Sequence, residues 1–170
     1  KETARTHEEK KQWPAAGQTW RYIVEKAKEV GDTAMRAEGN RGLARALAHM
    51  KKPRQALEYL EKALEAGVLK SETFKALADL HFGQLEKPGR AEDYYRQYLD
   101  ALDPETRAAP GAYLNLARLV SGNSPIEAIE YYQEAVGLGI LDERGPGDAE
   151  IEKEMGLLYA KLGLGQPAFE

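Results

Sequence analysis

Three histidines are the side chains of this sequence best suited to bind a metal ion. No two of His7, His49 and His81 are four residues apart, which is the spacing that places two metal ligands on one face of a helix. We therefore expect no metal and no other cofactor. His81 falls on an apolar stripe, which predicts a partly buried and hydrogen-bonded packing residue.

Carboxylates are abundant but stand beside no partner for catalysis. Glu8-Glu9, Glu92-Asp93 and Asp142-Glu143 adjoin no nucleophile and no glycine-rich phosphate loop, and Gly145-Pro146-Gly147 is typical of a joint. An acid–base pair needs a pocket that shifts one pKa, and helix surfaces rarely provide one. The chain has no cysteine, which excludes disulfides, thiolate metal sites and cysteine nucleophiles. The sequence predicts a protein that is not an enzyme.

The composition excludes further classes of protein. The 170 residues are 42% hydrophobic and 31% charged, which favours a folded chain. The formal net charge of -4 argues against a nucleic-acid binder, which needs clustered excess Lys and Arg. No apolar run reaches the roughly 20 residues of a membrane-spanning helix. We expect no signal peptide in this chain, and the absence of cysteine fits cytoplasm and periplasm alike, so the compartment stays open.

The sequence contains a repeated helical pattern, and these helices must position any binding surface of the protein. Three segments begin with Pro-x-x-Ala, at Pro53, Pro88 and Pro125, and each continues as an amphipathic helix of period 3.6. The small Ala permits close approach of another helix. The apolar positions that recur on one face are Ala56, Leu60 and Ala63, then Ala91, Tyr95 and Tyr98, then Ala128, Tyr132 and Ala135.

Another amphipathic helix precedes each of these segments and is marked by a large apolar residue followed by a small one. These pairs are Leu43-Ala44, Leu77-Ala78, Leu116-Ala117 and Met155-Gly156, at successive separations of 34, 39 and 39 residues. The pattern therefore predicts antiparallel helix pairs at about residues 33–67, 70–103 and 110–139, with the first helix of a fourth pair at 148–162.

The pattern resembles the tetratricopeptide repeat (TPR), a helix pair of 34 residues. The resemblance covers about residues 32–162 and implies an all-α solenoid of stacked antiparallel helix pairs, wound as a right-handed superhelix. We expect a single repeat domain over residues 13–165 that opens with a degenerate helix at 14–30. The ends are expected to be a charged, flexible tail at 1–12 and a tail or truncated helix at 166–170.

The resemblance also implies that the first helices of the pairs line a concave groove that binds a partner protein. Basic residues in this groove can steer an acidic peptide to it, and solvated surface charge is the competing interpretation. The candidate groove residues are Arg41, Arg45, Lys75, Asp79, Phe82, Leu114, Asn115 and Arg118.

The function that the resemblance implies is a non-catalytic scaffold or adaptor, which binds a peptide or a helix of another protein. The alternative is an assembly or oligomerisation module of a larger complex, such as a bacterial secretion or envelope complex. Self-association would then use Trp13, Trp20 or the open final helix pair, and the protein would form a homo-oligomer.

Overall fold

The computed structural model describes residues 1–103, 105–139 and 148–165. Every regular element within these ranges is a helix, as the sequence predicted. The contacts group the chain into two compact units, Lys1–Ala101 (unit 1) and Leu102–Glu170 (unit 2), and each is described by itself. That the repeats form a single domain stays a prediction.

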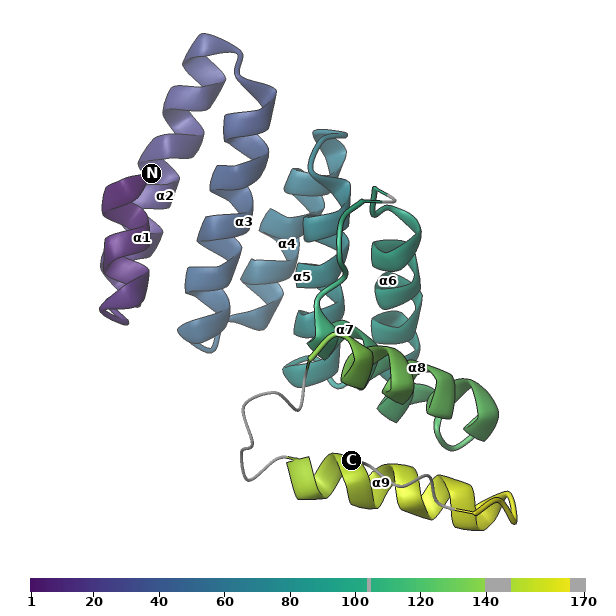
Figure 1. Ribbon diagram of the computed structural model, residues 1–170. Coiled ribbons are helices and arrows are strands. Elements are labelled where there is room, and N and C mark those ends of the chain that lie inside the picture. Colours follow the sequence, from purple (N-terminus) through teal and green to yellow (C-terminus); the bar gives the residue numbers. More distant parts are fainter. Residues whose placement is uncertain (104, 140–147, 166–170) are drawn as a thin grey trace. The chain divides into compact units, whose positions relative to one another are not determined.

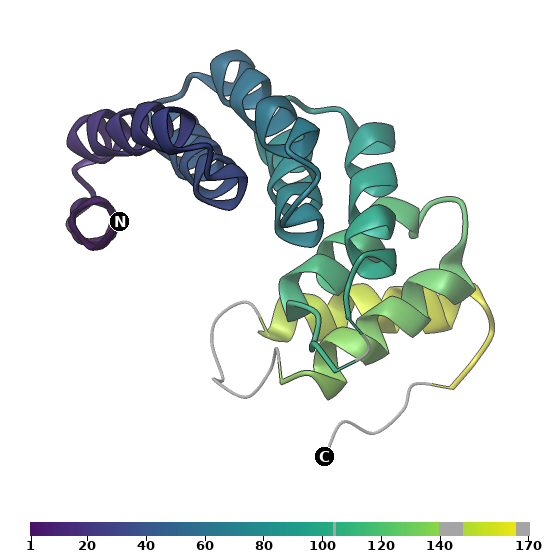
Figure 2. The same ribbon diagram turned by 90° about the horizontal axis from the view of Figure 1, so that it is seen from above.

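Unit 1 is built from helices that pack on their neighbours in chain order (Figure 1). Helices α3 and α4 form one antiparallel pair and α5 and α6 form the next. Figure 2 shows α1 nearly end-on beside the longer helices α2 and α3. The helices are α1 (Glu2–Glu9), α2 (Trp13–Val30), α3 (Thr33–His49), α4 (Pro53–Glu65), α5 (Lys70–Gly83) and α6 (Pro88–Asp100).

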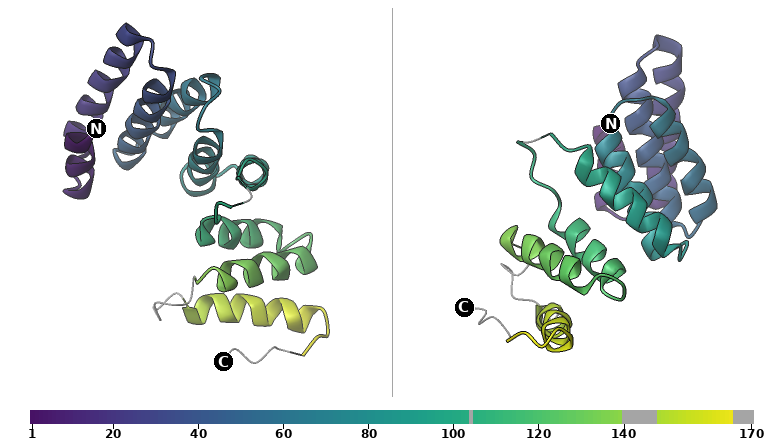
Figure 3. Two further views of the ribbon diagram at one scale, coloured as in Figure 1. Left: turned by 45° about the horizontal axis from the view of Figure 1, so that its top comes forward. Right: turned by 90° about the vertical axis from the view of Figure 1, so that its right-hand side faces the viewer.

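Unit 2 repeats the same arrangement with a third pair and one further helix. Its helices are α7 (Pro110–Val120), α8 (Pro125–Gly137) and α9 (Asp148–Lys161), and the three lie side by side in Figure 3. Helix α8 packs against both α7 and α9. The predicted joint at 145–147 and the predicted tail at 166–170 lie outside the described residues.

Local sequence signals set the helix ends. The Asp32 carboxylate accepts a hydrogen bond of 2.8 Å from the Met35 backbone N–H and so caps α3. Gly31 ends α2 with φ of 71°, a left-handed conformation that glycine adopts without strain. Proline lies in the first turn of α2, α4, α6, α7 and α8, where its missing N–H leaves no hydrogen bond unmade.

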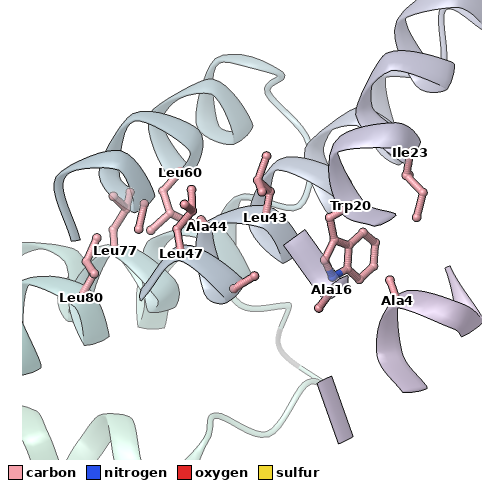
Figure 4. Packing of buried hydrophobic residues seen from close by; sticks show 12 residues of the cluster. Ala4, Ala16, Trp20, Ile23, Leu43, Ala44, Leu47, Leu60, Leu77 and Leu80 are labelled. Atoms are coloured by element: carbon pink, nitrogen blue, oxygen red, sulfur yellow. The ribbon is translucent and has the colours of Figure 1, made fainter. Parts of the chain in front are cut away.

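The repeated apolar positions form the core of each unit. The large residue of each first helix is buried, and so are the alanine and the large residue of each second helix. Helices α2 and α3 approach closely because Gly39 and Gly42 have no side chain; a Cβ on Gly42 would overlap the Trp20 ring. Figure 4 shows Trp20 between Ala4 and Leu43. The buried residues at repeated positions are Leu43, Leu77, Leu116 and Met155, Ala56, Ala91 and Ala128, and Leu60, Tyr95 and Tyr132.

Within each unit, contacts therefore join helices that are neighbours in the chain, with α3 and α5 also in contact across one pair. This local contact pattern is the mark of a solenoid, in which each helix pair completes its core with the next. The fold is an all-α solenoid. Among the described helices, none is both long enough and apolar enough to span a lipid bilayer.

The first twelve residues differ from the charged, flexible tail that we expected. Residues Glu2–Glu9 form helix α1, and its Ala4 side chain is fully buried in the core of unit 1. Lys1 and Arg5 form ion pairs with Glu38 of α3, and Glu8 forms one with Arg45 of the same helix. The prediction failed because α1 has only one buried apolar residue, which gives no periodic pattern, and the helix is otherwise held by ion pairs with α3.

Candidate partner-binding site

A pocket opens between the first helices of the two pairs in unit 1, α3 and α5, with α4 behind it. We call it the α3–α5 pocket; its volume is about 330 Å³. Its lining residues are Arg41, Ala44, Arg45, Ala48 and His49 of α3, Ala56 and Leu60 of α4, and Glu72, Ala76, Asp79, Leu80 and Gln84, which lie on or directly after α5.

The floor of the α3–α5 pocket is apolar and its rim is charged. Ala44 and Ala48 are four residues apart on α3, so they lie on one face, and Ala76 and Leu80 do the same on α5. Small side chains on both helices leave the space that the pocket occupies, and Leu60 of α4 closes it from behind. Figure 4 shows Ala44, Leu60 and Leu80 in this region. An apolar floor under a few charged groups is the usual construction of a ligand pocket.

Arg41 brings an unsatisfied charge to this pocket. Its side chain is only 16% exposed, and its Nε has no hydrogen-bond partner. The closest carboxylate oxygen belongs to Glu72 and lies 3.9 Å from Arg41 Nη1, which is too far for a hydrogen bond. Burial lowers the pKa of the guanidinium while the charge of Glu72 opposes that shift, and an arginine stays charged in proteins. A buried donor without an acceptor is destabilising and calls for an acceptor from outside.

Arg45, the second predicted arginine of α3, is exposed and engaged. Its Nη1 donates to Glu8 Oε2 at 2.8 Å, and its side chain is 55% exposed. The other oxygen of Glu8 accepts the Trp20 Nε1–H at 2.7 Å. The structure therefore places a carboxylate of α1 at the arginine that was expected to meet an acidic partner.

The remaining candidates of unit 1 separate into two groups. Asp79 lines the pocket, accepting from Lys75 Nζ at 2.7 Å and from the Tyr95 hydroxyl at 2.7 Å. Lys75 is thus tied to Asp79 and does not line the pocket. Phe82 is half-buried and does not line it either. Of the five candidates in unit 1, the pocket brings together Arg41, Arg45 and Asp79.

In unit 2, the candidate Arg118 is held by a network. Arg118 Nε donates to Glu154 Oε2 at 3.0 Å, and the Tyr132 hydroxyl donates to the same oxygen at 2.8 Å. Burial lowers the pKa of Arg118, but the hydrogen bond and charge of Glu154 outweigh it and raise that pKa. Burial and the Glu154 charge also raise the pKa of the Tyr132 hydroxyl, which stays protonated as a donor. Leu114 and Asn115 are half-buried on α7.

Comparison with solved structures identifies the type of repeat. BtubC (BKLC) from P. vanneervenii superimposes with a TM-score of 0.72 at 23% identity, covering 94% of this chain and 70% of BtubC. YrrB, described as a TPR protein with an unusual peptide-binding site, gives 0.65 at 20% identity, covering 94% of this chain and 74% of YrrB. The chain has a TPR-like repeat fold.

A further structure, described as TPR-like, agrees. Nearly identical TPR-like repeats of a putative kinesin light chain from Podosopora anserina give a TM-score of 0.66 at 21% identity, covering 95% of this chain and 84% of that one. Identities below 25% make these likenesses of fold. No protein-family model and no curated protein matches the sequence.

The two tryptophans, His49 and His81 all pack against other side chains in this fold. Trp20 is 2% exposed and belongs to the core, so it offers no surface for self-association. Trp13 stacks on His49, with ring centroids 3.7 Å apart. His81 is buried against Tyr94 as expected, but its Nδ1 has no hydrogen-bond partner, which corrects the prediction of a satisfied ring. In the described ranges, no three His, Asp or Glu side chains form a group that could hold a metal ion.

The sequence missed most of the apolar lining of the α3–α5 pocket. The groove positions of the TPR family selected charged residues, whereas the floor consists of Ala44, Ala76 and Leu80 and of Leu60 on the second helix. Among these first-helix residues, only Ala44 had a signal, as the small residue after Leu43, and it was used only to find the repeat; the corresponding Ala78 does not line the pocket. Glu72 precedes Leu77 by five residues, as Glu38 precedes Leu43, so its repeated spacing was a signal that the candidate list did not use. Gln84 carried no such signal.

Proposed function

We propose that unit 1 binds a segment of another protein in the α3–α5 pocket, as a non-catalytic scaffold or adaptor. The volume of about 330 Å³ suits one large apolar side chain of the partner. The floor of Ala44, Ala76 and Leu80 would bury that side chain and supply the apolar part of the affinity.

The observation that carries this proposal is the buried guanidinium of Arg41. Its Nε has no acceptor, and Glu72, whose Oε2 lies 3.9 Å from Nη1, gives the guanidinium no hydrogen bond. A carboxylate of the partner would complete a charge-assisted pair in a place that is already largely shielded from water. We therefore propose an acidic segment that carries an apolar residue next to its Asp or Glu.

Arg45 would act as a second contact. Arg45 itself is 55% exposed, so its guanidinium can donate to a partner carboxylate while Glu8, which is only 12% exposed and accepts the Trp20 Nε1–H, stays in place. The peptide-binding site described for YrrB supports a peptide as the kind of ligand.

Affinity capture with matched variants tests the proposal. The bait is the full chain as wild type, as Arg41→Met and as Arg54→Met. Methionine keeps the apolar stem of arginine and removes the charge, and Arg54 is an exposed arginine of α4 outside the pocket. Circular dichroism checks that all three fold alike. Proteins that bind through the pocket are retained by Arg54→Met and reduced at least about tenfold by Arg41→Met, the loss of one charged hydrogen bond.

A peptide from a captured protein then tests the chemistry. The peptide with its Asp or Glu is expected to bind at least about tenfold more tightly than the same peptide with Asn or Gln. Partners held equally by wild type and Arg41→Met would refute the α3–α5 pocket as the binding site. Equal affinity for the acidic and amide peptides would refute the acidic ligand.

An assembly module is the second candidate function. The observation that favours it is Leu157 of α9, a large apolar side chain that is 63% exposed. Sedimentation of wild type and Leu157→Ser over a range of concentrations tests it. A concentration-dependent oligomer that Leu157→Ser dissociates would support self-association through unit 2, whereas a monomer at all concentrations would exclude it.

A further inference from the structure

A second pocket of unit 1 lies on the other side of α3, between α2 and α4. We call it the α2–α4 pocket; its volume is also about 330 Å³. Its α3 residues, Arg36, Asn40 and Leu43, lie roughly opposite Arg41 and Arg45 at about 100° per residue around the helix. The lining residues are Arg21, Val24, Glu25 and Lys28 of α2, Arg36, Asn40 and Leu43 of α3, and Tyr59, Lys62 and Glu65 of α4.

Three polar side chains of the α2–α4 pocket lack partners among the residues that the structure describes. The guanidinium groups of Arg21 and Arg36 form no ion pair and no hydrogen bond there. Asn40 is only 4% exposed as a residue and its amide forms no hydrogen bond within the same residues, but the amide is not among the fully buried unpaired groups, which are Arg41 Nε and His81 Nδ1. Because Asn40 lines the pocket, its unpaired amide is available to bond to a ligand there.

The other charges of the pocket are already engaged. Lys28 Nζ lies 2.8 Å from Glu25, and Lys62 Nζ lies over the Tyr59 ring at 4.6 Å from its centroid. Lys62 thus covers one face of Tyr59, which disfavours stacking of an aromatic ligand or a nucleobase there. The free binding capacity is concentrated in Arg21, Arg36 and Asn40.

The net charge of the pocket lining favours a phosphate monoester over a carboxylate as the ligand. Four cations, Arg21, Lys28, Arg36 and Lys62, face the two carboxylates of Glu25 and Glu65, which leaves an excess of two positive charges. A carboxylate would neutralise only half of this excess, whereas a phosphate monoester carries about -1.5 to -2 charges and three acceptor oxygens. Two arginine forks and an amide NH2 supply donors for those three oxygens.

We infer that the α2–α4 pocket binds a phosphorylated side chain of a partner protein, of the phosphoserine type. The phosphate accepts hydrogen bonds from Arg21, Arg36 and Asn40, and the apolar floor of Val24 and Leu43 receives the carbon atoms next to the ester. The site is separate from the α3–α5 pocket in residues and in chemistry. Unit 1 can hold one segment on each side of α3, and phosphorylation of the partner controls only the second.

Nuclear magnetic resonance of the full chain tests the inference with N-acetyl-phosphoserine amide as the probe. The side-chain NH2 signals of Asn40 and the Nε–H signals of Arg21 and Arg36 are expected to shift and to saturate. N-acetyl-serine amide, which lacks the phosphate, is expected to leave them unchanged. Arg21→Gln and Arg36→Gln should each weaken binding about tenfold, the loss of one charged hydrogen bond.

Controls separate this inference from the proposed function and from simple charge attraction. Arg54→Gln removes an exposed arginine of α4 outside both pockets and should leave the affinity unchanged, as should Arg41→Met. Equal weakening by Arg54→Gln and Arg36→Gln would overturn the site in favour of general charge attraction. Inorganic phosphate that binds as tightly as the capped phosphoserine would overturn a side-chain ligand, because the apolar floor would then contribute nothing.

Discussion

Two arginines at equivalent repeat positions, Arg45 in unit 1 and Arg118 in unit 2, have different surroundings. Both follow the large residue of a first helix by two places, and both form an ion pair with a carboxylate of another helix, Glu8 of α1 and Glu154 of α9. Arg45 is 55% exposed and pairs with Glu8, whereas Arg118 is 32% exposed and shares Glu154 with the Tyr132 hydroxyl. The repeat therefore fixes where an arginine stands but leaves open how firmly it is held.

The two sites differ in how far each arginine is exposed to a binding partner. In unit 2 one carboxylate oxygen accepts from a guanidinium and from a buried tyrosine, and a shared network of this kind resists replacement of one member. In unit 1 Glu8 likewise joins a guanidinium to the buried Trp20 ring, but Arg45 is 55% exposed and the buried Arg41 beside it lacks an acceptor. We therefore expect partner binding at α3 and α5 and a mainly structural role for Arg118.

The largest expected effect tests whether the two units are stabilised separately. Trp20→Ala removes the largest buried side chain of unit 1 and should lower its free energy of unfolding by about 3–5 kcal/mol. Both tryptophans, Trp13 and Trp20, belong to unit 1, so the fluorescence of Trp13 still reports on that unit during urea unfolding. Circular dichroism reports on the helices of both units.

In Trp20→Ala, the fluorescence transition is expected to move to lower urea while part of the helical signal persists. Tyr22→Ala, at a tyrosine that is 64% exposed on the same helix, should change the free energy of unfolding by less than about 0.5 kcal/mol. If the fluorescence and circular dichroism transitions of Trp20→Ala shifted to lower urea by the same amount, the two units would unfold as one.

A smaller loss of stability is expected when a carboxylate is removed from either unit, and the size of that loss should differ between the units. Glu154→Ala leaves Arg118 and the Tyr132 hydroxyl without their acceptor and should destabilise unit 2 by about 1–3 kcal/mol. Glu72→Ala is the matched change in unit 1. Glu72 is 52% exposed and 3.9 Å from Arg41, so its loss should cost at most about 0.5 kcal/mol. Urea unfolding by circular dichroism measures both, and equal losses would remove the distinction between the units.

Much of the fold could be predicted because the core repeats. Ala56, Ala91 and Ala128 recur at the same place in each pair, and all three are fully buried in the structure. Burial of a small residue at a helix crossing depends on the local sequence, so spacing alone reveals it. Helix α1 escaped prediction because a single buried alanine, Ala4, gives no periodic signal.

The charge networks could not be read from the motifs, because each joins residues about one repeat apart. Arg45 and Glu8 are 37 residues apart, and Arg118 and Glu154 are 36 residues apart. Opposite charges about one repeat apart could have suggested these ion pairs. That spacing does not distinguish a bonded pair from two solvated charges. Whether Arg41 lacks an acceptor depends on side-chain placement, which the sequence pattern does not encode.

The smallest expected effect concerns His81 and the pH dependence of unit 1. Burial and the charge of Arg90 lower the pKa of His81, while Glu61 opposes this shift. The folded unit therefore resists protonation that the unfolded chain accepts near the ordinary pKa of about 6.5. The free energy of unfolding is therefore highest above about pH 6.5, where His81 is neutral in both states. It falls as the pH drops from about 6.5 toward the lowered pKa of the folded state, because in this range the unfolded chain binds a proton that the folded unit does not.

His81→Phe keeps an aromatic ring against Tyr94 and removes the titrating group. Its tryptophan-detected urea midpoint should therefore fall less than that of wild type between pH 7 and pH 5. His7 and His49 remain in both proteins, so the difference between the two pH profiles isolates His81. It corresponds to at most one proton, since one group titrates, which makes it smaller than the loss of Trp20. Parallel profiles would mean that water reaches the unpaired Nδ1 and that this part of the unit 1 core is more open than the burial of His81 indicates.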